Sequence, residues 1–233
     1  MKKWIGLILI LALCLSICAC AGADEEAALP ELGEYALYAG FGRENITPLE
    51  PVPMGGYGVS EKRIHQNVLD DIYITAIALT DRGGETILLM NWDGVRAYTK
   101  TQEMVRLSIS QKTGIALDHI FLGCTHSHSA PDMDSSMDSI NRYVAYVIQQ
   151  STKCAQEALA DRRPANMSAG TVEAEGLNFV RHYVTTQADG TDVYFGDSFG
   201  TSVYNDTTKH VSQADPTMFM LYFDMASGKD MAL

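Results

Sequence analysis

Two histidines separated by one serine, His126 and His128, are the residues of this sequence best suited to chemistry. They follow an apolar run, Ile120–Cys124, and precede Ala130-Pro131. Neutral imidazole is a common zinc ligand, and the serines beside each histidine could hydrogen-bond around it. The His-x-His pattern by itself leaves two interpretations open. The pair belongs to a metal or catalytic site, or it consists of polar histidines that are satisfied structurally.

The residues before the pair predict a buried strand that ends at a pocket. The run Ile120–Cys124 is apolar on both faces, which is typical of a parallel strand covered by helices on each side. Side chains two apart on an extended chain point the same way, so we expect both imidazoles to face one cavity.

Other strands and turns are predicted around this one. Strands are expected at three earlier segments, 35–42, 72–80 and 86–92, with a hairpin turn at 81–84. Asp93, which follows the third of them, is interpreted as a turn-forming residue before Gly94 rather than a site residue. A loop with three glycines around Tyr57 is interpreted as a surface loop, although its backbone could approach another group closely.

Two helices are predicted between these strands and Pro164. The first opens with a capping box at 99–102 and ends at Gly114. The second begins at Ser136 or Ser139. This order of elements predicts an α/β fold, with a mixed β-sheet flanked by helices in a single domain. Sites in such sheets gather at the carboxyl ends of strands, where the two histidines would lie.

The last third of the chain is predicted to be strand and loop. Residues 166–172 and 217–224 are expected to be extended, and 185–214 are expected to form a long surface loop. A turn at 226–229 leads into the start of a partner strand at 230–233. We therefore expect the domain to be incomplete in this sequence.

The amino-terminal residues 1–23 have the pattern of an export leader. Two lysines precede a short apolar core, too short to be a confident spanning helix, and small residues follow. The sequence Ile17–Cys20 resembles a lipobox, which would make Cys20 a lipid-carrying membrane anchor. Cleavage after Ala21 or Ala23 is the alternative. Either outcome predicts an exported protein, a cell-envelope lipoprotein or a secreted one, with 24–34 as a tether to a domain over 35–233.

The composition and net charge of the chain limit which classes of macromolecule it can bind. The chain has 46% apolar and 20% charged residues, as globular proteins do, and a formal net charge of -12. Such a surface repels phosphate backbones, so nucleic acid is excluded as a partner. Cys124 and Cys154 are the only cysteines outside the leader region. They make no disulfide framework and are expected to be inert core thiols.

Four motifs, in order, resemble the amino-terminal domain of the neutral/alkaline, non-lysosomal ceramidase family, from about Tyr38 to the end. Tyr38–Pro48 is similar to the family's opening strand and Asp-Ile-Thr-Pro motif, with Asn45 replacing the acid, and Met54–Tyr57 is similar to its Met-Gly-Tyr loop. Gly123–Pro131 is similar to its Gly-Thr-His-Thr-His-Ser-Gly-Pro signature. Asn178–Tyr183 falls where the family has an Asn-Arg segment. The third motif is the most specific of them.

The resemblance implies a zinc-dependent amide hydrolase that cleaves the N-acyl bond of ceramide-like lipids. His126 matches the zinc-binding histidine, His128 the second active-site histidine, and Arg181 the substrate-contacting arginine. The family's other metal ligands and its active-site serine would lie beyond Leu233. Two alternatives remain open: a related amide or ester hydrolase, and a non-catalytic exported lipoprotein that binds a ligand through the same cleft.

Overall fold

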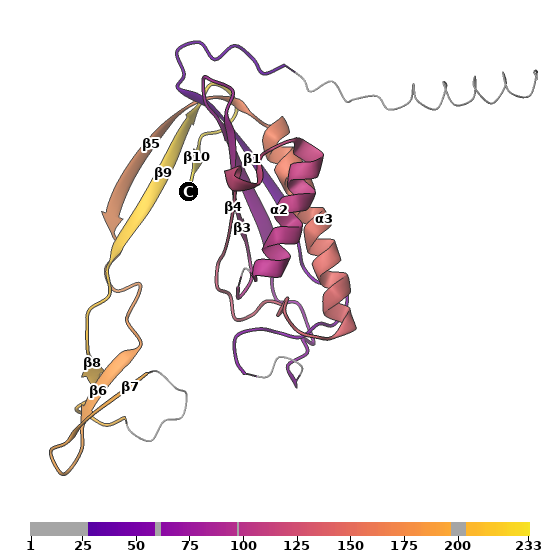
Figure 1. The fold of residues 1–233 in the computed structure, drawn as a ribbon. Coiled ribbons are helices and arrows are strands. Elements are labelled where there is room, and N and C mark those ends of the chain that lie inside the picture. Colours follow the sequence, from indigo (N-terminus) through magenta and orange to yellow (C-terminus); the bar gives the residue numbers. More distant parts are fainter. Residues whose placement is uncertain (1–27, 59–61, 97, 197–203) are drawn as a thin grey trace, which may run out of the picture. The chain divides into compact units, whose positions relative to one another are not determined.

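A computed structural model of the chain describes residues 28–58, 62–96, 98–196 and 204–233 (Figure 1). The predicted leader, with Cys20, and the first part of the tether lie outside these residues. The chain divides into two compact units, one over 38–163 with the segment before Glu34, the other over 34–37 and 164–233. In the described ranges, no helix has both the length and the apolar character needed to cross a bilayer.

The first unit contains a mixed sheet in the order β1-β2-β3-β4. Its strands are β1 (Leu37–Asn45), β2 (Tyr73–Thr80), β3 (Thr86–Trp92) and β4 (Ile120–Cys124). The first three strands pair antiparallel, whereas β3 and β4 pair parallel. The predicted α/β class with a mixed sheet is confirmed. The predicted hairpin turn is also present, where the Asp81 carboxylate accepts hydrogen bonds from the backbone N–H groups of Gly83 and Glu85.

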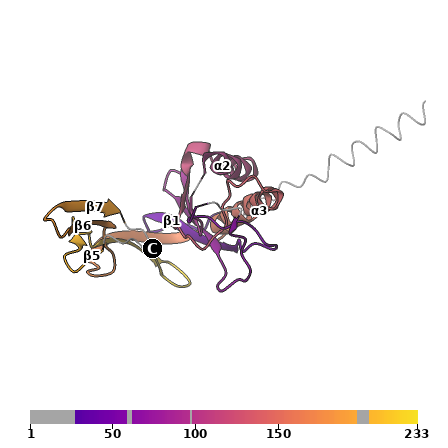
Figure 2. The same cartoon turned by 90° about the horizontal axis from the view of Figure 1, so that it is seen from below.

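Helices α2 (Thr99–Thr113) and α3 (Asp138–Ala160) lie side by side over one face of this sheet (Figures 1 and 2). Alternate residues of the central strands point toward the helices and are buried: Ile74, Ala76, Ala78, Leu88, Met90 and Trp92. The helices contribute the remaining core side chains, among them Val105, Ile109, Ile140 and Val147. The alternation along each strand therefore encodes which face of the sheet is covered.

The prediction that helices cover both faces of the histidine strand is wrong for the described structure. β4 is the last strand of the first unit's sheet, and Ile120 is buried on the helix side. Phe121 points to the other face and is 54% exposed. A run of apolar residues does not reveal whether one or both faces of a strand are covered, because both cases give the same pattern.

The helices occur where predicted, but their amino-terminal caps differ. Tyr98 and Met137 occupy the N-cap positions of α2 and α3, and neither makes a side-chain cap hydrogen bond. The capping box predicted at 99–102 is therefore absent. The carboxyl end of α2 agrees with the prediction, since Gly114 adopts a left-handed conformation with φ of 75°. Cys154 is buried in α3, and burial raises the pKa of its thiol to about 12, as expected for an inert core thiol.

The second unit contains two groups of antiparallel strands. One is built from β5 (Arg163–Glu173), β9 (Thr217–Met225) and β10 (Met231–Ala232). The other has β6 (His182–Thr186) between β7 (Asp192–Gly196) and β8 (Lys209–His210). The long loop predicted over 185–214 is thus partly wrong. An Asp189-Gly190 turn joins two short strands there, and the alternation of only five residues in β7 was too short a signal.

Two glycines of β1 let α3 approach the sheet closely. A Cβ atom at Gly40 would lie 2.1 Å from the Ala158 carbonyl oxygen, and one at Gly42 would lie 2.2 Å from that of Cys154. These neighbours are backbone atoms of a helix, so they cannot move aside as a flexible side chain would.

We therefore expect Gly42→Ala to reduce the free energy of unfolding by about 1–3 kcal/mol, because α3 must shift away from β1. Gly123→Ala is the control in the same sheet. The nearest atom to its Cβ would be in the Asn91 side chain, at 3.1 Å, on an exposed residue that can turn away, and the Met90 carbonyl oxygen would lie at an ordinary contact distance of 4.0 Å. Chemical denaturation of both variants measures the difference. Equal stability of the two variants would contradict this account of the helix–strand contact.

Candidate active site

The parallel pairing of β3 and β4 brings two strand ends to one edge of the sheet. Trp92 is directly opposite Cys124 in the register, so the segments that follow leave the sheet together. Two backbone hydrogen bonds continue the pairing beyond the strands, from Thr125 N–H to the Trp92 carbonyl (3.0 Å) and from Ser127 N–H to the Gly94 carbonyl (3.1 Å). The loop that carries the histidines is therefore held along its length.

His126 is oriented by a hydrogen bond to the loop after β3. Its Nδ1 atom lies 2.6 Å from the Val95 carbonyl oxygen. A carbonyl can only accept, so Nδ1 must carry a proton and the neutral ring presents the Nε2 lone pair outward. This arrangement is typical of metal-binding histidines, in which a second partner sets the tautomer and the ring orientation.

The backbone of His126 is also unusual. Its φ of 58° is the only positive value among the non-glycine residues that the structure describes. Conformations of this kind cost about 1–3 kcal/mol and tend to occur at functional sites. The turn replaces the extended conformation from which convergence of the two imidazoles was predicted.

His128 nevertheless meets His126. Their Nε2 atoms are 3.3 Å apart, and the ring centroids lie 4.8 Å apart at an interplanar angle of 76°. His126 is exposed and His128 is half-buried, so neither is a core residue. This exposure places the pair outside the core. The Nε2–Nε2 contact is itself a hydrogen bond, so the interpretation as a structurally satisfied pair stays open beside the metal-site interpretation.

The glycine-rich loop packs directly against His128. A Cβ atom at Gly56 would lie 2.4 Å from the ring, and Gly56 has a φ of 101°. Tyr57 makes an edge contact with the same ring, with centroids 4.9 Å apart. Arg63 lies over the Tyr57 ring and donates to the Gly55 carbonyl oxygen (3.0 Å). The three glycines around Tyr57 and the resemblance of Met54–Tyr57 to a family motif were the sequence signals at this loop.

Further hydrogen bonds join the three loops around the pair. Gly55 N–H donates to the Ala130 carbonyl, and Asp132 N–H donates to the Pro53 carbonyl. The Tyr98 hydroxyl donates to the Asp132 carboxylate at 2.7 Å. Burial and this hydrogen bond raise the pKa of Tyr98 further above its usual range, so the hydroxyl remains a donor to Asp132 even in alkaline solution.

Asp93 makes two hydrogen bonds with the first residue of β2. Its carboxylate accepts the Tyr73 N–H at 2.9 Å, and its own N–H donates to the Tyr73 carbonyl. These bonds hold the first residue of β2 next to the residue that follows β3.

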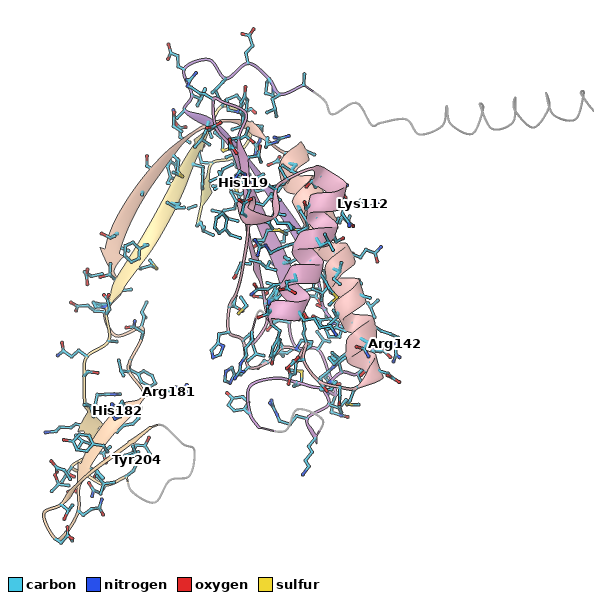
Figure 3. All side chains as sticks on the ribbon, viewed as in Figure 1. Lys112, His119, Arg142, Arg181, His182 and Tyr204 are labelled. Atoms are coloured by element: carbon cyan, nitrogen blue, oxygen red, sulfur yellow. The ribbon has the colours of Figure 1, made fainter. Side chains whose placement is uncertain are left out.

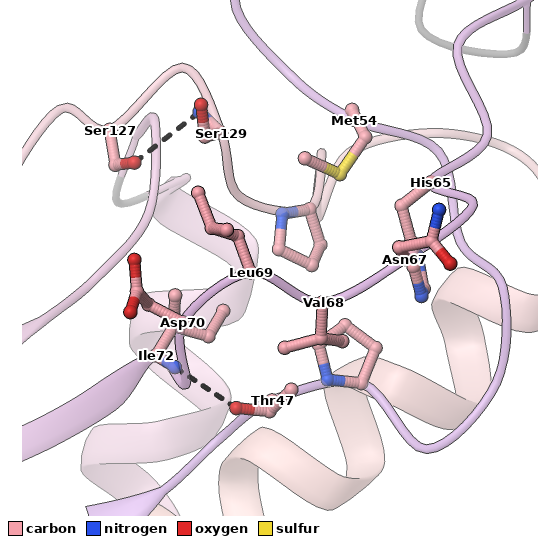
Figure 4. A pocket seen from close by; sticks show the side chains of 12 residues that line it. Thr47, Met54, His65, Asn67, Val68, Leu69, Asp70, Ile72, Ser127 and Ser129 are labelled. Carbon is pink, nitrogen blue, oxygen red and sulfur yellow. Dashed lines mark hydrogen bonds between the residues drawn. The ribbon is translucent and has the colours of Figure 1, made fainter.

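A cavity of about 430 Å³ lies beside the histidine loop (Figure 4). Ser127 and Ser129, which alternate with the histidines, line it, and the Ser127 hydroxyl accepts the Ser129 N–H at 3.3 Å. Much of the remaining wall is apolar: Pro48, Met54, Val68, Leu69, Ile72 and Pro131. The loop therefore presents serines to an open, largely apolar cavity.

Arg181, the third predicted site residue, belongs to the second unit (Figure 3). It is exposed and immediately precedes β6. Its role in a site with the histidines stays a prediction.

The geometry of the histidine pair fits one part of a zinc site. Two nitrogen ligands about 2.0–2.1 Å from one tetrahedral zinc ion lie about 3.3 Å apart. The two Nε2 atoms have this separation, 3.3 Å. Within the described part of the chain, however, no group of three or more His, Cys, Asp or Glu side chains is placed to hold a metal ion. Catalytic zinc sites commonly use three protein ligands, so the described residues supply only a portion of one.

Comparison with solved structures gives a similar fold. The neutral ceramidase of Pseudomonas aeruginosa matches with a TM-score of 0.62 and 17% identity, over 85% of this chain and 31% of that chain. A second structure, a ceramidase complexed with C2, matches with a TM-score of 0.61 and 18% identity, over 84% and 30% of the two chains. The likeness is one of fold.

The chain thus spans about a third of the length of the structures it resembles. No protein-family profile matches the sequence, and no curated protein matches it either.

The positive φ of His126 leads to a prediction about stability. We expect His126→Gly to be more stable than His126→Ala by about 1 kcal/mol. A left-handed backbone conformation is unfavourable for alanine, whereas glycine adopts it without this cost. Both variants lose the same imidazole. The measurement is the unfolding free energy of each.

At His128, whose φ is not positive, the order should reverse, with His128→Ala more stable than His128→Gly. The same order at both positions would show that the backbone of His126 is not held in the left-handed region.

Proposed function

We propose that this chain carries the first part of the active site of a zinc-dependent amide hydrolase of the neutral ceramidase type. The observation that carries the proposal is the histidine pair. One imidazole is oriented by a backbone carbonyl, and the two Nε2 atoms are 3.3 Å apart at the carboxyl ends of parallel strands. The ceramidase-like fold supports the same assignment.

In this proposal His126 holds the zinc ion through Nε2, and His128 lies next to it as the second active-site histidine. When bound, zinc supplies Lewis acidity that polarises an amide carbonyl and makes water a stronger acid. The Val95 carbonyl keeps the His126 ring in the required tautomer. Gly56 and Tyr57 keep the His128 ring beside it. Arg181 is proposed to hold the substrate or its developing negative charge.

The substrate proposed is a ceramide-like lipid, cleaved at its N-acyl bond. The largely apolar cavity beside Ser127 and Ser129 could accommodate part of an aliphatic chain. The other ligands of the zinc ion would come from polypeptide outside the described residues.

The test is hydrolysis of ceramide and of short N-acyl amides by the purified protein in its longest natural form, with and without a zinc chelator. We expect fatty-acid release that the chelator abolishes and added zinc restores. His126→Ala and His128→Ala should each reduce release by at least about 100-fold, since removal of a metal ligand or its close partner disables the site. The control is His119→Ala, since His119 instead pairs with Glu85 and the Thr86 carbonyl.

Each alternative has its own outcome. Cleavage of short N-acyl amides but not ceramide would assign a related amide hydrolase. No cleavage of either by a protein that still folds would leave a ligand-binding role. Full activity of His126→Ala would reject the proposed metal ligand.

We also propose that the protein is exported and anchored in the membrane through a lipid on Cys20. Cys20→Ser should move the protein from the membrane fraction to the soluble fraction, whereas Cys18→Ser should not, because only the first residue after cleavage receives the lipid. Mass spectrometry of the mature amino terminus provides the check. A terminus at Gly22 or Asp24 without lipid would instead support ordinary cleavage and secretion.

A further inference from the structure

The small sheet of the second unit carries a row of aromatic rings across its three strands. Tyr183 of β6 is opposite Phe195 of β7 and His210 of β8. The ring centroids are 5.6 Å and 4.7 Å from that of Tyr183. Tyr204 makes edge contacts with both Tyr183 and Phe195, at 5.5 Å and 5.0 Å. Figure 3 shows Tyr204 at this sheet.

Phe179 extends this row beyond the sheet. Its ring centroid lies 5.5 Å from that of His210, and Phe179 is 61% exposed. We call these five residues, Phe179, Tyr183, Phe195, Tyr204 and His210, the aromatic platform.

A cavity of about 330 Å³ adjoins one end of the platform. Phe179 and His210 form its aromatic wall, and Glu175, Ser212 and Gln213 are among its polar lining residues. His210 Nδ1 lies 2.8 Å from the Val180 carbonyl oxygen and must donate to it, so the neutral ring has its Nε2 lone pair available as an acceptor. The cavity therefore combines an aromatic ring with a carboxylate, an imidazole acceptor, a hydroxyl and an amide.

We propose that this cavity binds a sugar ring of a glycan. One face of a pyranose presents C–H groups, which pack on an aromatic ring, while its hydroxyls both donate and accept hydrogen bonds. Glu175 and His210 supply acceptors for those hydroxyls, and the Gln213 amide supplies both donors and an acceptor. The volume is near the lower end for small-molecule sites, which suits a single ring.

Two other ligand classes fit less well. Nucleic-acid bases also stack on aromatic platforms, but a net charge of -12 repels the phosphates attached to them. Quaternary ammonium groups need rings arranged around a gap. Among the residues that line this cavity, only Phe179 and His210 have aromatic rings. These two rings pack against each other with centroids 5.5 Å apart and do not surround a gap. The sugar site shares the segment before β6 with Arg181, but its lining contains none of the three residues assigned to the proposed hydrolase, His126, His128 and Arg181.

The experiment is saturation-transfer NMR on the full chain with methyl glycosides of glucose, galactose, mannose and N-acetylglucosamine. Tetramethylammonium serves as the competing probe. We expect transfer to the ring C–H protons of at least one glycoside. Phe179→Ala should weaken its binding about tenfold, the effect of losing one aromatic contact, and Phe179→Trp should retain it.

The matched control is Tyr194→Ala. Tyr194 is 60% exposed, like Phe179, but neighbours His182 on the face of the sheet opposite Phe195. Its removal should leave glycoside binding unchanged. Absence of transfer to all four glycosides, binding of tetramethylammonium alone, or equal loss in the Phe179→Ala and Tyr194→Ala variants would each overturn the proposal. Retained ring-proton shifts of Tyr183 show that Phe179→Ala has folded.

Discussion

The parallel pairing of β3 with β4 is the constraint on which the histidine site depends. Because both strands run the same way, the loops after Trp92 and Cys124 leave the sheet at one edge. The Val95 carbonyl then lies within hydrogen-bond distance of His126. An antiparallel pairing would send the two loops to opposite edges, and neither the ring orientation nor the pairing of the imidazoles would follow.

Contacts from several loops stabilise the left-handed backbone of His126 and the close packing around His128. The left-handed backbone of His126 persists because backbone bonds from Thr125 and Ser127 hold the residues on both sides of it. The ring of His128 lies where only a glycine at position 56 leaves it room. A site assembled from three loops keeps its geometry in this way while its imidazoles remain open to a ligand.

Much of the fold was predictable because its signals are local. The alternation in 72–80 and 86–92, the turn between them and the glycine after α2 are each encoded within a few residues, and the structure has them where expected. The histidine motif could also be recognised, since its residue types suit metal chemistry whatever the fold. Local signals failed for the helix caps, where Tyr98 and Met137 occupy positions that polar residues usually take, and for β7, which is too short to show a period.

The sequence by itself thus determined the class of fold, the strands and helices of the first unit and the two histidines as candidates for chemistry. Only the tertiary structure decided that β4 is covered by helices on one face, that Gly56 packs on His128, and that the Val95 carbonyl orients His126. Each of these depends on segments far apart in the chain that meet through sheet register and helix packing. The periodicity of a single segment carries no information about its partners.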